Sequence, residues 1–166
     1  MPFGSLSAVR HRDGDRHEAD DRCRQFAACP FRLRDEPPVI RWGEESCAHC
    51  RMLIGDPQFA AAIVMQDGEV RKYDDVGCLL NDGAKRQANV HRLWVRRYDA
   101  DGWLDARKAW FVVSQKIASP MGYGIAAFAR KEDAERLAKQ VGGIALRWDD
   151  LLKRTPIKPT QRGWTQ

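Results

Sequence analysis

Two stretches of the sequence, KYDDVGCLL (residues 72–80) and AFARKEDAERL (residues 127–137), decide the fold. In each, a strand-like segment leads through a short polar turn into a helical pattern. Asp74 or Asp75 is placed to cap the first helix, and a glycine pair at 142–143 ends the second. Aligning the two stretches puts both helices at the same place in a repeated unit.

The segments around these two helices complete the repeat. Short apolar or alternating runs predict three strands in each pass of the chain. They are 59–65, 69–73 and 91–98 around a helix at 74–85, and 108–115, 124–130 and 144–148 around a helix at 131–143. Both passes run strand, strand, helix, strand. We therefore predict an α+β fold of two ββαβ halves that arose by internal duplication.

The pattern also predicts how the chain is divided. Residues 1–44 show no sustained apolar period and are expected to form a disordered leader. The first half is expected to span 45–104 and the second 105–154, and 155–166 reads as a flexible tail. No stretch approaches the length of an apolar membrane helix. The formal net charge of +5 comes from basic residues interspersed with acidic ones, so we do not expect nucleic acid as a partner.

The stretch ESCAHCRMLIGDP (45–57) gathers two cysteines, a histidine and a methionine within six positions. A structural zinc site would need about four ligands, and no second C-x-x-C motif follows. A thioredoxin-like dithiol normally stands at a helix N-terminus after a strand, whereas this motif precedes the first predicted strand. Thiolate and thioether ligands together favour Cu(I). Among the three alternatives, only the soft-metal site gives Met52 a role beyond packing.

Other residues with metal-binding side chains have simpler interpretations. Cys78 falls on the apolar side of its helix and is interpreted as a small buried residue. His49 could donate a ring nitrogen to the metal ion, or its side chain could point away from the site. Asp74 and Asp75 could act in acid-base chemistry, but helix capping explains them more simply. Met121 lies in a loop between proline and glycine, and the repeat would let it reach the Cys50 and Met52 site across the two halves.

Taken in order, several stretches resemble the NosL family of copper chaperone lipoproteins that serve nitrous oxide reductase in denitrification. They lie between Cys47 and Leu152 and read CAHCRMLI, KYDDVGCLL, DGWLDARKAWFVV, SPMGYGIAAF and RWDDL. The resemblance implies two ββαβ halves, similar in topology to part of organomercurial lyase. It implies a non-enzymatic protein that delivers Cu(I) to the copper-sulfide centre of the reductase in the periplasm. It also implies Cys50, Met52 and Met121 as copper ligands, with Cys47 as a further candidate.

The family further implies a lipid anchor and two partners. These are a copper-supplying membrane transporter and a copper-accepting enzyme similar to nitrous oxide reductase. FAAC (26–29) matches the end of a lipoprotein signal, which would place the lipid on Cys29. The first 25 residues carry Arg and Asp where a signal peptide has an apolar segment. We expect the upstream DNA to encode that segment in another frame or from another start; otherwise a cytoplasmic location is the alternative.

One alternative function belongs to a different class. A thiol-disulfide oxidoreductase, or an enzyme similar to organomercurial lyase, would use the C-x-x-C cysteines chemically instead of holding an ion with them. No serine or histidine constellation typical of nucleophilic catalysis stands out in the sequence. We therefore favour a binding and transfer protein over an enzyme.

Overall fold

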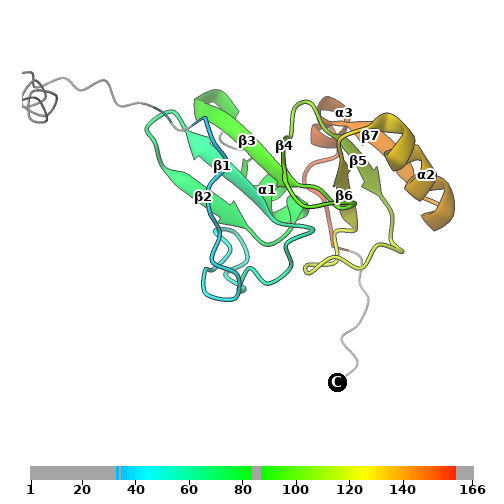
Figure 1. Cartoon of the computed structure of the whole chain (residues 1–166), viewed down its shortest axis with the longest axis horizontal. Coiled ribbons are helices and arrows are strands. Elements are labelled where there is room, and N and C mark those ends of the chain that lie inside the picture. The colour runs from blue at the N-terminus through cyan, green and yellow to red at the C-terminus, as the bar shows by residue number, and fades with distance from the viewer. Residues whose placement is uncertain (1–32, 34, 84–86, 160–166) are drawn as a thin grey trace, which may run out of the picture. The chain divides into compact units, whose positions relative to one another are not determined.

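The structure is a computed structural model that describes residues 33, 35–83 and 87–159. Seven strands, three α-helices and a short 3₁₀ helix make up its regular elements in these ranges (Figure 1). They are β1 (Ala61–Met65), β2 (Val70–Tyr73), α1 (Val76–Gly83), η2 (Gln87–Asn89), β3 (Val90–Arg96), β4 (Trp103–Asp105), β5 (Trp110–Val113), β6 (Ile125–Phe128), α2 (Lys131–Val141), β7 (Ile144–Arg147) and α3 (Trp148–Leu152).

The strands form two antiparallel sheets with the same internal topology. The first sheet has the order β2-β1-β3-β4 and the second has the order β6-β5-β7. In each sheet the first strand of the unit lies in the centre, with the second strand on one side and the strand after the helix on the other. The predicted α+β fold with two ββαβ units is therefore confirmed.

Strand β4 was not expected from the sequence. No strand was predicted between residues 98 and 108, yet residues 103–105 pair with residues 94–96 of β3 in antiparallel register. A three-residue strand beside Gly102, whose φ is 125°, is too short to display an alternating pattern. Its pairing with β3 extends the first sheet beyond the repeated unit.

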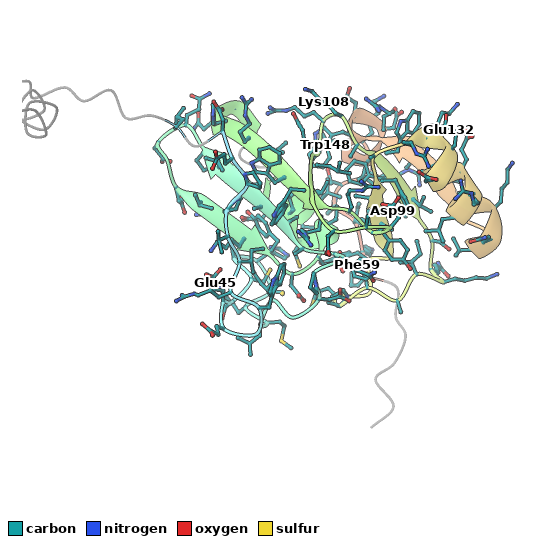
Figure 2. The ribbon with its side chains drawn as sticks, in the orientation of Figure 1. Glu45, Phe59, Asp99, Lys108, Glu132 and Trp148 are labelled. Carbon is teal, nitrogen blue, oxygen red and sulfur yellow. The ribbon has the colours of Figure 1, made fainter. Side chains whose placement is uncertain are left out.

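The last predicted strand is one residue too long. It was expected to include Trp148, but β7 ends at Arg147 and Trp148 begins α3. Asp149 and Asp150 lie in the first turn of that helix, where negative charge interacts favourably with the helix dipole. Trp148, labelled in Figure 2, is buried. The centroid of its ring lies 5.8 Å from that of Phe111.

Helix α1 contacts strands of both sheets. It contacts β1 and β2 of the first sheet and β6 of the second. The Asp75 side chain accepts a hydrogen bond from the backbone N–H of Gly77 at 2.9 Å, so the predicted cap is Asp75. Five of the eight residues of α1 form a continuous buried run: Val76, Gly77, Cys78, Leu79 and Leu80. A side chain on α1 can therefore meet groups from either half.

Helix α2 covers the second sheet, where it contacts β5, β6 and β7. It ends as predicted at a glycine pair: Gly142 has a φ of 61°, and the N–H of Gly143 bonds to the carbonyl of Ala138. The ring of Tyr98 lies between those of Phe59 and Phe128, at centroid distances of 5.6 and 5.7 Å and tilted to both. Phe59, labelled in Figure 2, thereby joins the start of the first half to the second sheet.

The chain on either side of the two units also contributes to the packing. Of the predicted leader, residues 1–32 and 34 lie outside the described residues, but Ile40 is buried in the main core. Of the predicted tail, residues 160–166 lie outside them, whereas Ile157 packs against the same core and exchanges backbone hydrogen bonds with the Asn81 side chain. In the described ranges, no helix has the length and apolar character needed to cross a membrane.

Candidate metal centre

The two cysteines of the C-x-x-C motif lie on a loop that precedes β1, here called the cysteine loop (residues 43–57). Its arms are held together by an antiparallel bridge between Ser46 and Leu53 and by the N–H of Gly43, which donates to the carbonyl of Ile54. The N–H of Ala48 donates to the carbonyl of Lys72 at 2.9 Å, which fastens the loop to the edge of β2. Glu45, labelled in Figure 2, forms a salt bridge with the Lys72 ammonium group.

A tight turn at the tip of this loop sets the direction of its side chains. The N–H of Arg51 donates to the carbonyl of Cys47 at 3.1 Å, and the N–H of Cys47 donates to the carbonyl of Met52 at 2.8 Å. Arg51 has a φ of 68°, the only positive value among the described non-glycine residues. A left-handed conformation is unfavourable for a residue with a side chain. The surrounding hydrogen bonds hold the turn in this conformation.

Three thiols, two from the cysteine loop and one from α1, lie close together. The sulfur atoms of Cys47, Cys50 and Cys78 all lie within 4.8 Å of one another, and none of the three forms a disulfide. Cys47 and Cys78 are fully buried, whereas Cys50 is partly exposed. Among the residues that the structure describes, no histidine or carboxylate joins this thiol cluster.

The cluster favours one ionised thiol. The Cys78 thiol donates a hydrogen bond to the Cys47 sulfur, and backbone N–H groups of Asp74, Cys50 and His49 donate to the same sulfur. These hydrogen bonds stabilise the thiolate, so the pKa of Cys47 falls to about 5. The same hydrogen bond, together with burial, raises the pKa of Cys78. Burial raises the pKa of Cys50 as well. Near neutral pH, Cys47 is therefore a thiolate, which is the form that binds metals.

Two buried carboxyl groups lie beside the cluster. Asp74 accepts a hydrogen bond from the N–H of Gly55 in the cysteine loop, and burial raises its pKa to about 6. Asp75 accepts hydrogen bonds from Ser119 and Met121 in the second half in addition to the cap bond from Gly77. Burial raises the pKa of Asp75 also. Neither carboxyl group belongs to the thiol cluster itself.

The donor set is that of a site for a soft metal ion. Thiolates bind Cu(I) and zinc strongly, whereas hard cations prefer oxygen ligands. A closed structural zinc site has four ligands, and the described residues contribute three thiols here. A site of three thiols therefore suits an ion that accepts fewer than four protein ligands.

A comparison with protein families identifies the family of this chain. The family model described as NosL matches residues 39–155. The chain belongs to the NosL family. It is 25% identical over 124 residues to the copper-binding lipoprotein NosL of Stutzerimonas stutzeri; the match covers 69% of this chain and 65% of that protein. The crystal structure of the copper chaperone NosL from Shewanella denitrificans superposes with a TM-score of 0.60 at 26% identity and covers 70% of this chain and 96% of that one.

Against this NosL fold, the structure places the four predicted ligands in different environments. Cys47 and Cys50 belong to the thiol cluster. Met121 is partly buried and packs against the core that contains Cys47 and Cys78. The side chain of Met52 is 57% exposed. Residues i and i+2 share a face in extended chain, but the left-handed Arg51 between Cys50 and Met52 interrupts that period.

The sequence of this NosL-family chain did not reveal that Cys78 belongs to the thiol cluster. Its predicted burial is confirmed, but the structure also directs its thiol at Cys47 and Cys50. The signal available in the sequence was a third cysteine on the buried face of a predicted helix that follows the C-x-x-C motif. His49, by contrast, is exposed, and its ring is not part of the thiol cluster.

Proposed function

We propose that this chain is a copper-binding metallochaperone that holds a single Cu(I) ion at the thiol cluster and passes it to a copper-accepting enzyme. Nitrous oxide reductase, or a related copper enzyme, is the proposed acceptor. The observation that carries the proposal is the meeting of Cys47, Cys50 and Cys78 within 4.8 Å. The two relatives described above, a copper-binding lipoprotein and a copper chaperone, support copper as the metal.

The chemistry of the cluster supports Cu(I) as the oxidation state. Thiolate and thioether ligands favour the monovalent ion over harder cations. Cys47 is already ionised at neutral pH because Cys78 and three backbone N–H groups stabilise its charge. Binding therefore requires fewer protons to leave than it would for three ordinary thiols. The neutral thioether of Met121, whose side chain packs against the core that contains Cys47 and Cys78, would complete the site.

The difference in burial among the ligands supports transfer instead of permanent storage. Cys47 and Cys78 are shielded from solvent, whereas Cys50 is partly exposed. An incoming ligand on an acceptor protein could reach the metal next to Cys50 without unfolding α1. Met52, exposed two residues further on, offers a weak neutral ligand on that outer side. Such exchange moves the ion and requires no chemical turnover, as we propose for a protein that is not an enzyme.

We further propose that the protein works at the periplasmic face of a bacterial membrane. The relative from Stutzerimonas stutzeri is named a lipoprotein, and this chain covers 65% of its length. A lipid on Cys29, which lies outside the described residues, would keep the chaperone close to a copper-supplying membrane transporter. Mass spectrometry of the protein from its native membrane fraction tests this: a diacylglyceryl group at Cys29 is expected, and an unmodified cytosolic chain contradicts it.

Anaerobic titration of the reduced protein with Cu(I), in competition with a coloured Cu(I) chelator, tests the metal site. The wild-type chain is expected to bind a single Cu(I) ion. Cys50→Ser and Cys78→Ser should each weaken binding by more than about 100-fold, beyond the range typical of residues that only support a ligand. Met52→Ala should have a smaller effect, and Met52→Leu is the matched control that removes the sulfur but keeps the bulk.

The same preparation separates the proposal from its enzymatic rival. If the reduced protein fails to compete for Cu(I) but reduces disulfide substrates catalytically, the chain is an oxidoreductase and the proposal is wrong. Unchanged Cu(I) affinity in both Cys50→Ser and Cys78→Ser would also overturn it, because the thiol cluster would then not be the site.

A further inference from the structure

The Asp75 carboxylate makes more contacts than a helix cap requires. It is fully buried, and one oxygen, Oδ1, accepts the N–H of Gly77 at 2.9 Å. The other oxygen, Oδ2, accepts the hydroxyl of Ser119 at 2.6 Å and the N–H of Met121 at 3.2 Å. Capping uses only the first of these bonds. The second oxygen is committed entirely to a loop of the other half.

That loop, residues 114–124, is here called the Met121 loop. Besides donating to Asp75, the Ser119 hydroxyl accepts the N–H of Gly124 at 3.0 Å, and the Ser119 carbonyl accepts the N–H of Gly122 at 2.9 Å. Gly124 has a φ of 66°, and a Cβ at that position would lie 2.1 Å from the carbonyl oxygen of Ser114. The loop is therefore closely folded on itself, and Asp75 holds its middle.

The contacts of Asp75 connect two parts of the candidate site. Asp75 stands one turn before Cys78 and caps the helix that presents that thiol. Its other oxygen fixes the backbone of Met121, whose side chain packs against the core containing Cys47 and Cys78. Burying a carboxylate is costly unless hydrogen bonds compensate for the lost water. Because the buried Asp75 side chain is hydrogen-bonded to both α1 and the Met121 loop, it fixes the position of the loop relative to the helix.

We propose that Asp75 is a positioning residue that holds the Met121 thioether at the thiol cluster, so that both halves of the fold contribute to one Cu(I) site. This inference rests on the proposed function, since it assumes that Cu(I) binds at the cluster. Asp75 does not touch the metal in this arrangement. It acts through the Met121 backbone and through Ser119.

Two variants and a matched control test the role of Asp75. Ser119→Ala removes one donor to Oδ2 and leaves the helix cap intact. Asp75→Asn keeps the size of the side chain and its capping ability, but one carboxylate oxygen becomes an NH₂ group, which cannot accept a hydrogen bond. Ser114→Ala is the control: Ser114 is also nearly buried in the Met121 loop, but its hydroxyl bonds to Val141 and Lys116 and not to Asp75.

The readout is the NMR signal of the Met121 methyl group, observed in full-length protein whose methionine methyl groups are labelled with ¹³C. Met121→Leu identifies the Met121 signal. In the wild type, Cu(I) should shift that signal, whereas in Ser119→Ala and Asp75→Asn the shift should be reduced or lost. Cu(I) affinity should fall by about 10- to 100-fold in Asp75→Asn, as is typical for residues that orient a metal ligand. Ser114→Ala should behave as the wild type does.

The possible results separate this inference from the proposed function. If the wild type binds no Cu(I), the proposed function fails. If the wild type binds Cu(I) but its Met121 signal does not move, or if both variants keep the full wild-type shift, the role of Asp75 is overturned while the copper site stands. A loss of the shift in both variants, with the unliganded spectra otherwise preserved, supports the positioning role over a purely structural one.

Discussion

Replacing Gly77 with alanine would add one methyl group where α1 meets the Met121 loop. A Cβ at that position would lie 2.0 Å from Cγ, 2.3 Å from Cδ2 and 2.6 Å from Cβ of Tyr123. These atoms are at the base of the tyrosine side chain, so rotating the ring cannot relieve the contact. The flanking Gly122 and Gly124 already have positive φ values, and Gly124 is packed against the Ser114 carbonyl. The loop has little room to retreat.

The expected change in stability follows from opposing effects. Overpacking a well-filled site costs about 1–3 kcal/mol. Displacing Tyr123 also breaks the 3.1 Å hydrogen bond between Asn81 and its hydroxyl, at about 1 kcal/mol. Alanine in place of glycine within a helix returns about 1 kcal/mol. We therefore expect Gly77→Ala to lower the free energy of unfolding by about 1–3 kcal/mol, as the sum of these contributions.

Urea denaturation of the metal-free, reduced protein measures this change. Gly83→Ala is the matched control, since Gly83 lies in the same helix but its added Cβ would meet only the Cδ1 atom of Ile63, at 2.9 Å. That atom is the far end of a flexible side chain, so the helix preference of alanine should offset most of the cost. If Gly77→Ala were as stable as the wild type, or no less stable than Gly83→Ala, the packing of Tyr123 on α1 would be refuted.

Three further predictions concern the thiols, the turn and the chain after α3. The ultraviolet absorbance of a thiolate should appear with a midpoint near pH 5 in the metal-free protein, present above it and lost below it, and should be absent from Cys47→Ser. Arg51→Gly should stabilise the fold by up to about 1 kcal/mol in thermal unfolding, because glycine adopts a positive φ without strain; a lower melting temperature would contradict this. Asn81→Ala removes the hydrogen bonds to Tyr123 and Ile157 and should cost about 2–3 kcal/mol in urea; an unchanged midpoint would show that residues after α3 do not dock.

Much of the fold could be predicted because its signals are local. The helix cap at Asp75 and the glycine end of α2 each depend on a few neighbouring residues. Period-two and helical patterns then assign the strands and helices between them. Strand β4 escaped prediction because its regularity comes from pairing with β3, not from its own three residues.

The sequence by itself favoured a soft-metal site, since one turn of chain brings Cys47 and Cys50 together close to Met52. It also indicated that Cys78 would be buried. Only the tertiary structure decided that Cys78 completes the thiol cluster, because α1 must pack across the start of the first half for that thiol to arrive. It also decided that Met52 faces solvent, through the left-handed Arg51. Contacts between residues 28 or more positions apart, such as Cys78 with Cys50 or Asp75 with Met121, depend on how the elements pack, and no local pattern specifies that packing.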